Sequence, residues 1–89
     1  MYSIVLSQKA LHYLKELDKN IETRLRKRLK RLEENPVPTD TKFLGRHQND
    51  KVFRYRIGDY RALYKIKDKE KVVLITKIDK RPKVYKAGF

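Results

Sequence analysis

Apolar and polar side chains alternate strictly over residues 52–57. The apolar positions on one parity are Phe53, Tyr55 and Ile57. A period of two is typical of a β-strand with one buried face. Residues 58–59, Gly-Asp, separate this run from a second run of β-forming residues at 60–67. Because glycine adopts positive φ at the first position of a type II′ turn, the sequence predicts a β-hairpin here.

The two-residue loop also predicts the register of this hairpin. It places Ile57 opposite Tyr60 and, one step further from the turn, Arg56 opposite Arg61. One face is then apolar, and the other carries the cations Arg54, Arg56, Arg61, Lys65 and Lys67. Two arginines opposite each other repel, whereas an opposite-charge pair gains about 0.2–1 kcal/mol. Either an anion binds between them, or this is the solvated face of a half-exposed sheet in a very basic chain.

The residues before the hairpin predict one strand and two helices. Residues 2–6 are nearly continuously apolar, which favours a strand buried within a sheet. A first helix begins after Ser7, a suitable N-cap, and runs to about Leu17. A second helix follows a turn at residues 18–20 and ends at Asn35, because a proline comes next. Each helix has a single apolar stripe, so we expect a helical hairpin packed on the apolar face of the sheet.

The remaining segments complete an α+β domain. Residues 37–50 predict a loop, which the Lys-Phe-Leu-Gly sequence at 42–45 would pin to the core. Residues 72–75 are apolar on both parities, which indicates a central strand. We therefore expect an N-terminal strand, an α-helical hairpin and a three-stranded antiparallel meander in one small sheet, with both helices on one face. The whole chain, residues 1–89, forms a single domain in this interpretation.

Composition points to a polyanionic partner. The chain carries 24 Lys and Arg against 11 Asp and Glu, a formal net charge of +13. This excess favours nucleic acid first and an acidic protein second. The sequence has no Cys, which excludes disulfides, thiolate catalysis and zinc-finger ligation. No apolar run approaches the ~18–20 residues of a membrane span, so we expect a cytoplasmic protein that binds neither a membrane nor a small-molecule cofactor.

Several further side chains are either binding residues or ordinary surface and packing residues. His12 and His47 have no second ligand at metal-binding spacing, and we interpret them as surface or packing residues. The second helix is basic around its apolar stripe, either as a solvated surface or as a contact for phosphates or an acidic partner. Beside the arginines of the hairpin, the predicted RNA-binding residues are Lys65, Lys67, Lys80, Lys83 and Arg28.

Two motifs resemble those of a known family. The hairpin sequence F-R-Y-R-I-G-D-Y-R-A-L-Y at 53–64 and the sequence K-R-P-K-V-Y at 80–85 are similar to RelE toxins of the RelE/ParE superfamily. The resemblance spans nearly the whole chain, and the second motif favours the RNA-cleaving RelE branch over the gyrase-poisoning ParE branch. It implies the toxin of a type II toxin–antitoxin system. Such a toxin cuts mRNA in the ribosomal A site without metal or cofactor, and a RelB-like antitoxin that wraps around it keeps it inactive.

The same resemblance assigns catalytic residues. The family's basic pair falls on Arg54 and Arg56, its hairpin arginine on Arg61, its late arginine on Arg81 and its near-terminal tyrosine on Tyr85. RNA carries its own nucleophile, the 2′-hydroxyl, and guanidinium groups suit bidentate capture of a phosphate. Electrostatic stabilisation of the dianionic transition state can be the main catalytic effect.

Roles follow from this assignment. Arg61 and Arg56 would bind the scissile phosphate, and Arg81 would stabilise the transition state or assist the leaving oxygen. Tyr85 would stack on a base, act as a base itself, or pack on the core. A RelE form of the family has lysines where Arg54 and Arg56 stand here, and arginine stays protonated, so the general base is left open. The alternatives are a non-enzymatic ParE-like gyrase inhibitor and a plain nucleic-acid-binding module.

Overall fold

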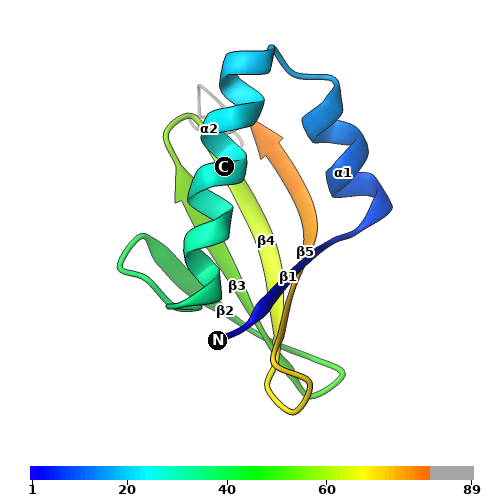
Figure 1. Ribbon diagram of the computed structural model, residues 1–89. Helices are drawn as coiled ribbons and strands as arrows, with labels where there is room; N and C mark the ends of the chain where they lie inside the picture. The colour runs from blue at the N-terminus through cyan, green and yellow to red at the C-terminus, as the bar shows by residue number, and fades with distance from the viewer. Residues whose placement is uncertain (81–89) are drawn as a thin grey trace, which may run out of the picture.

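The computed structural model describes residues 1–80, and Figure 1 shows the arrangement of their helices and strands. The elements are β1 (Ser3–Leu6), α1 (Gln8–Lys15), α2 (Lys19–Lys30), the 3-10 turn η1 (Arg31–Glu33), β2 (Thr41–His47), β3 (Asp50–Ile57), β4 (Tyr60–Lys67) and β5 (Val72–Lys80). They form one five-stranded sheet in the order β1-β5-β4-β3-β2. β1 runs parallel to β5, and all other neighbours are antiparallel. The α+β class and the order of its elements are confirmed.

The central hairpin has the predicted register. Ile57 pairs with Tyr60, and Arg56 pairs with Arg61. Gly58 has a φ of +58°, the positive value expected at the first position of the turn. Because side chains alternate along a strand, this register separates the buried residues of β3 and β4 from the charged ones.

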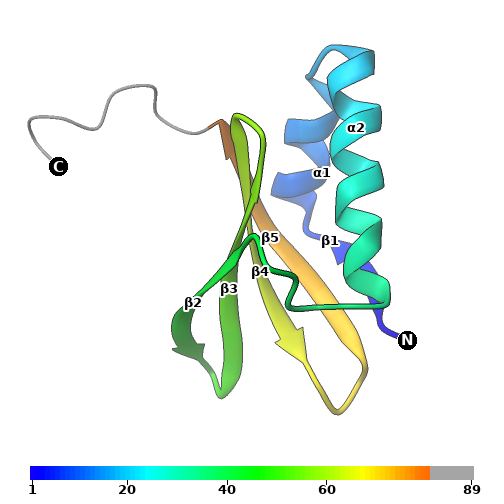
Figure 2. The same ribbon diagram turned by 90° about the vertical axis from the view of Figure 1, so that its left-hand side faces the viewer.

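Both helices cover one face of the sheet, which Figure 2 shows edge-on. The core lies between them, with the aromatic side chains of β3 and β4 against Leu14 of α1 and Leu25 and Leu29 of α2. Each helix begins at a side-chain cap, and the cap of α1 is the predicted Ser7. The Ser7 hydroxyl accepts a hydrogen bond from the Ala10 amide at 3.1 Å, and the Asp18 carboxylate accepts one from the Asn20 amide at 3.0 Å.

The helices end earlier than predicted. α1 stops at Lys15 rather than near Leu17, and the regular part of α2 stops at Lys30 rather than Asn35. η1 continues the second helix with the tighter 3-10 winding that is frequent at helix ends.

The first strand is predicted correctly, but its burial is not. β1 lies at the edge of the sheet, and Val5 keeps 43% of its surface exposed. The helices cover one face only, so Ile4 and Leu6 pack against the core while Val5 points to the opposite face. Residues 2–6 are thus nearly all apolar, but the strand that they form is buried on one face only.

A further strand occupies the segment predicted as a loop. β2 pairs with β3, so four antiparallel strands follow the helices, and not three. A register shift between Phe43 and Gly45 breaks the alternation that would have revealed the strand. Phe43 and Leu44 are 52% and 47% exposed. The prediction that this segment is pinned to the core holds for Phe43, whose ring centre lies 5.4 Å from that of the buried Phe53, and no such contact is found for Leu44 within residues 1–80.

Tyr64 attaches the start of this segment to the core as well. Its side chain is fully buried, and its hydroxyl donates a hydrogen bond to the Pro36 carbonyl at 2.6 Å. Burial raises the pKa of Tyr64 above its ordinary value of 10.0. Because the folded pKa exceeds the unfolded one, the neutral phenol stabilises the fold fully below about pH 10, and this contribution is lost as the pH rises further.

We therefore expect Tyr64→Phe to lower stability by about 0.5–1.5 kcal/mol near neutral pH, because the Pro36 carbonyl loses its donor. The variant lacks the titrating hydroxyl, so the stability difference between wild type and Tyr64→Phe should narrow above about pH 10. Thermal midpoints of both proteins from about pH 7 to about pH 11 test this. An equal decline in both proteins over the alkaline range would contradict it.

Candidate functional site

The candidate site lies on the face of the sheet opposite the helices, which we call the open face. Figure 2 shows both helices on the other side of the sheet. Strand pairing places Arg56 of β3 beside Arg61 of β4, and Arg61 beside Asp79 of β5. We call these three residues the arginine row.

A second row of open-face residues lies next to the arginine row. Arg54 pairs with Lys42 of β2 on one side and with Leu63 of β4 on the other, and Leu63 pairs with Lys77 of β5. Along β3 the two rows are two residues apart, about 7 Å at the usual rise of a strand. The structure thus brings Arg54, Arg56 and Arg61 together on one face.

The three arginines are available to a ligand. Arg54 and Arg61 are partly buried and Arg56 is exposed. Within residues 1–80, none of them forms an ion pair. The carboxylate in the arginine row belongs to Asp79, and it is paired with the Lys77 ammonium at 3.3 Å. The arrangement can bind a phosphate between the guanidinium groups, as bidentate donors do.

The other predicted RNA-binding residues are distributed unevenly. Lys65 and Lys67 also lie on the open face, further from the hairpin turn. The Lys67 ammonium is engaged by the Asp50 carboxylate at 3.1 Å. Lys80 shares the parity of the buried Ile78, so its position in β5 is on the helix side. The predicted residues Arg81, Lys83 and Tyr85 lie outside the described residues.

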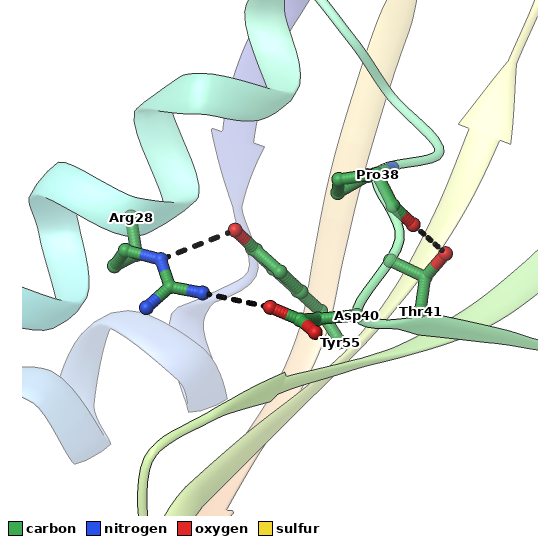
Figure 3. A network of polar contacts seen from close by, with 5 residues as sticks. All are labelled: Arg28, Pro38, Asp40, Thr41 and Tyr55. Atoms are coloured by element: carbon green, nitrogen blue, oxygen red, sulfur yellow. Dashed lines mark hydrogen bonds and ion pairs between the residues drawn. The ribbon is translucent and has the colours of Figure 1, made fainter.

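Arg28 is separated from the arginine row by the sheet itself. It projects from α2 on the helix side, where Figure 3 shows its guanidinium facing both the Tyr55 hydroxyl and the Asp40 carboxylate. Its Nε donates to the Tyr55 hydroxyl at 3.4 Å, and its Nη2 lies 3.4 Å from the Asp40 carboxylate. The guanidinium also lies 5.6 Å from the centre of the Tyr55 ring. This basic residue of α2 therefore joins the helix to β3.

The contacts of Arg28 reach the strand that carries the arginines. The Arg56 amide donates to the Asp40 carbonyl at 3.0 Å, just before β2 begins. The neighbouring Thr41 is fixed by its own hydroxyl, which donates to the Pro38 carbonyl at 2.7 Å (Figure 3). Tyr55 lies between Arg54 and Arg56 in the sequence, so this network supports β3 from behind the open face.

We expect Asp40→Asn to lower the free energy of unfolding by less than about 1 kcal/mol, because the lost ion pair is partly exposed. Arg28→Ala should cost more, about 1–2 kcal/mol, since it also removes the contact with the Tyr55 ring. Urea unfolding measures both changes. Glu22→Gln is the control, because it breaks the 2.9 Å pair with Arg26 on the same helix without touching β3. Equal losses in Arg28→Ala and Glu22→Gln would contradict a special role of Arg28.

The described part of the chain gives no support for a metal site or for a membrane-spanning helix. Residues 1–80 contain no group of three or more His, Cys, Asp or Glu side chains placed to hold a metal ion. No helix within this range is long and apolar enough to cross a membrane.

Comparison with known proteins shows the family. Residues 4–85 match the family model described as the ParE toxin of the type II toxin–antitoxin system parDE. The chain belongs to the RelE/ParE superfamily of toxins. A curated relative from Methanocaldococcus jannaschii, named "Putative toxin RelE1", is 27% identical over 86 residues and covers 96% of each chain.

Solved structures agree with this assignment. The toxin is similar to a chain of the archaeal RelE–RelB complex from Pyrococcus horikoshii, with a TM-score of 0.83 and 29% identity over 93% of this chain and 98% of that one. It is also similar to a chain of the toxin–antitoxin complex RelBE2 from Mycobacterium tuberculosis, with a TM-score of 0.75 and 28% identity, covering 90% of this chain and 98% of that one. The chain is thus the toxin of a toxin–antitoxin system of the RelE family.

Proposed function

We propose that this toxin is a ribosome-dependent endoribonuclease that cleaves mRNA in the ribosomal A site. The observation that supports this most is the arginine row with its neighbour Arg54, which gathers three guanidinium groups on one open face without ion pairs inside residues 1–80. A family member that only binds protein has no need for Arg56 opposite Arg61, since that pair is repulsive without an anion.

The proposed chemistry uses the nucleophile that RNA itself carries. The 2′-oxygen attacks the adjacent phosphorus, and the bond from phosphorus to the 5′-oxygen breaks, which leaves a 2′,3′-cyclic phosphate and a 5′-hydroxyl. Arg56 and Arg61 bind the two non-bridging oxygens and stabilise the additional negative charge of the transition state. Arg54 holds the neighbouring part of the RNA backbone. The proposal keeps Arg81 and Tyr85 as assisting residues, on the family resemblance alone.

The partner that restrains the toxin is proposed to be a RelB-like antitoxin. Both of the similar structures described above are RelE–RelB or RelBE complexes, which supports a partner of this kind. With a net charge of +13, the toxin attracts an acidic protein as well as RNA. Action on translating ribosomes implies a cytoplasmic location.

Purified toxin and ribosomes programmed with a defined mRNA test the proposal directly. We expect primer extension to show breaks within the A-site codon, none on the same mRNA without ribosomes, and none when the nucleotide at the cut has a 2′-deoxyribose. Breaks that do not depend on the ribosome, or no breaks at all, would overturn the proposal.

The ParE name of the matching family model favours one alternative, a gyrase inhibitor. A DNA supercoiling assay with the same toxin preparation separates the two functions. Inhibition of supercoiling by the toxin, together with intact mRNA on programmed ribosomes, would establish the alternative.

A further inference from the structure

The cleavage proposed above needs a group that the arginines cannot supply. The 2′-hydroxyl must lose its proton as its oxygen bonds to phosphorus, and arginine remains protonated in proteins. Lysine side chains on the open face, such as Lys42 and Lys65, are charged donors in their usual state. Within residues 1–80, the search for the proton acceptor therefore turns to the carboxylates of this face.

Asp79 is the carboxylate that the fold places in the arginine row. It pairs with Arg61 across β4 and β5, and side chains opposite each other in antiparallel strands have Cβ atoms about 4.5–5.5 Å apart. Its side chain is 34% exposed, so a ligand on the open face can reach it. A second partly buried carboxylate on the open face belongs to Asp50. It lies six residues before Arg56 on β3, and so about 20 Å from the arginine row.

The orientation of Asp79 is fixed by its own strand. Lys77 lies two residues earlier on β5 and on the same face, and its ammonium is 3.3 Å from the Asp79 carboxylate. This contact holds the carboxylate on the open face, on the strand next to Arg61. A phosphate bound by Arg61 would thus have an oriented carboxylate on the neighbouring strand.

We propose that Asp79 is the general base of the cleavage reaction, an inference that rests on the proposed function. A carboxylate oxygen of Asp79 takes the 2′-hydroxyl proton while the 2′-oxygen forms its bond to phosphorus. The phosphorus–oxygen bond to the 5′-oxygen breaks, and that oxygen takes a proton from water. Asp79 then returns its proton to the resulting hydroxide, so that no proton is gained or lost over the reaction.

A competing role for Asp79 predicts the opposite result. If Asp79 only neutralises Lys77 and weakens the repulsion near Arg61, its removal adds one net positive charge to the open face. RNA would then bind more tightly, and KM would fall while kcat stayed the same. A general base behaves differently, because its loss lowers kcat, whereas the added charge changes KM under either role.

Asp79→Asn tests the inference with minimal change of shape. We expect kcat on programmed ribosomes to fall by about 10²–10⁴-fold, whereas a role in charge neutralisation alone leaves kcat unaltered. The limb of the pH–rate profile that reports deprotonation of the base should disappear. Asp79→Glu keeps a carboxylate and should retain a kcat at least about tenfold above that of Asp79→Asn.

Asp50→Asn is the matched control. It breaks a similar carboxylate–lysine pair on the same face, 3.1 Å in length, but far from the arginine row. We expect its kcat to equal that of wild type, and circular dichroism should show all three variants folded. A kcat for Asp79→Asn within about threefold of wild type, or equal values for Asp79→Asn and Asp79→Glu, would overturn the inference. If the wild-type toxin does not cleave mRNA, the proposed function is wrong, and so is the role of Asp79. If the wild type and Asp79→Asn cleave equally well, only the role of Asp79 is wrong.

Discussion

Replacing Arg61 with alanine is expected to reduce the rate of mRNA cleavage more than replacing either of the other two arginines of the open face. Arg61 lies between Arg56 and Asp79 in the arginine row, so it is the central donor to a bound phosphate. Losing one preorganised donor to a developing oxyanion costs about 10²–10³ in kcat, about 2.7–4 kcal/mol. Single-turnover cleavage on programmed ribosomes measures the loss. Arg61 is not part of the buried core, so the thermal midpoint should stay within a few degrees.

Lys27→Ala is the control for this change, because it also removes one positive charge. Lys27 is exposed on α2, on the helix side of the sheet, and should leave kcat unaltered. Both variants weaken long-range attraction to RNA by one charge, so a loss specific to Arg61 must come from its position. Equal effects of the two substitutions would support a plain nucleic-acid-binding module, whose affinity is set by total charge.

The largest effect on stability is expected at Ile75. Its side chain is fully buried on β5, a strand that pairs with both β1 and β4. Ile75→Ala should lower the free energy of unfolding by about 2–5 kcal/mol, since truncation removes buried surface and leaves a cavity. The free energy of unfolding of a small domain is only about 5–15 kcal/mol in total, so this substitution would remove a large part of it. Equilibrium unfolding in urea measures the change.

Leu74→Ala provides the comparison on the same strand. Leu74 precedes Ile75 and points to the open face, where it is only partly buried. We expect its truncation to cost clearly less than that of Ile75. A larger loss for Leu74→Ala would mean that the open face of the isolated toxin contributes to the core, which the burial pattern of β5 does not suggest.

The sequence predicts the hairpin well because two local signals agree on it. Strict alternation in 52–57 fixes which side chains share a face, and the two-residue turn allows only one register. Arg56 opposite Arg61 follows from these signals alone. β2 escapes prediction because the irregularity between Phe43 and Gly45 interrupts its alternation.

The neighbours of Asp79 and Arg28 in the fold could not be predicted from local sequence patterns. The pairing of β4 with β5 contains a register shift between Leu63 and Tyr64, so the partner of Arg61 cannot be counted from the loop that joins these strands. Arg28 is one of several cations on α2, and only tertiary packing selects it to meet Tyr55. In both cases the deciding information is which segments become neighbours.

The parallel pairing of β1 with β5 has a consequence for the timing of folding. The Ser7 hydroxyl, just after β1, donates to the Thr76 carbonyl on β5, a contact across 69 residues of chain. A growing polypeptide can form its helical hairpin and the β3–β4 ribbon early, but β1 finds its partner strand only when synthesis of the described chain is nearly over. Contacts between such distant residues slow folding. Asp79 joins Arg61 at that same late stage, so the arginine row is complete only after β5, the last described strand, has been synthesised.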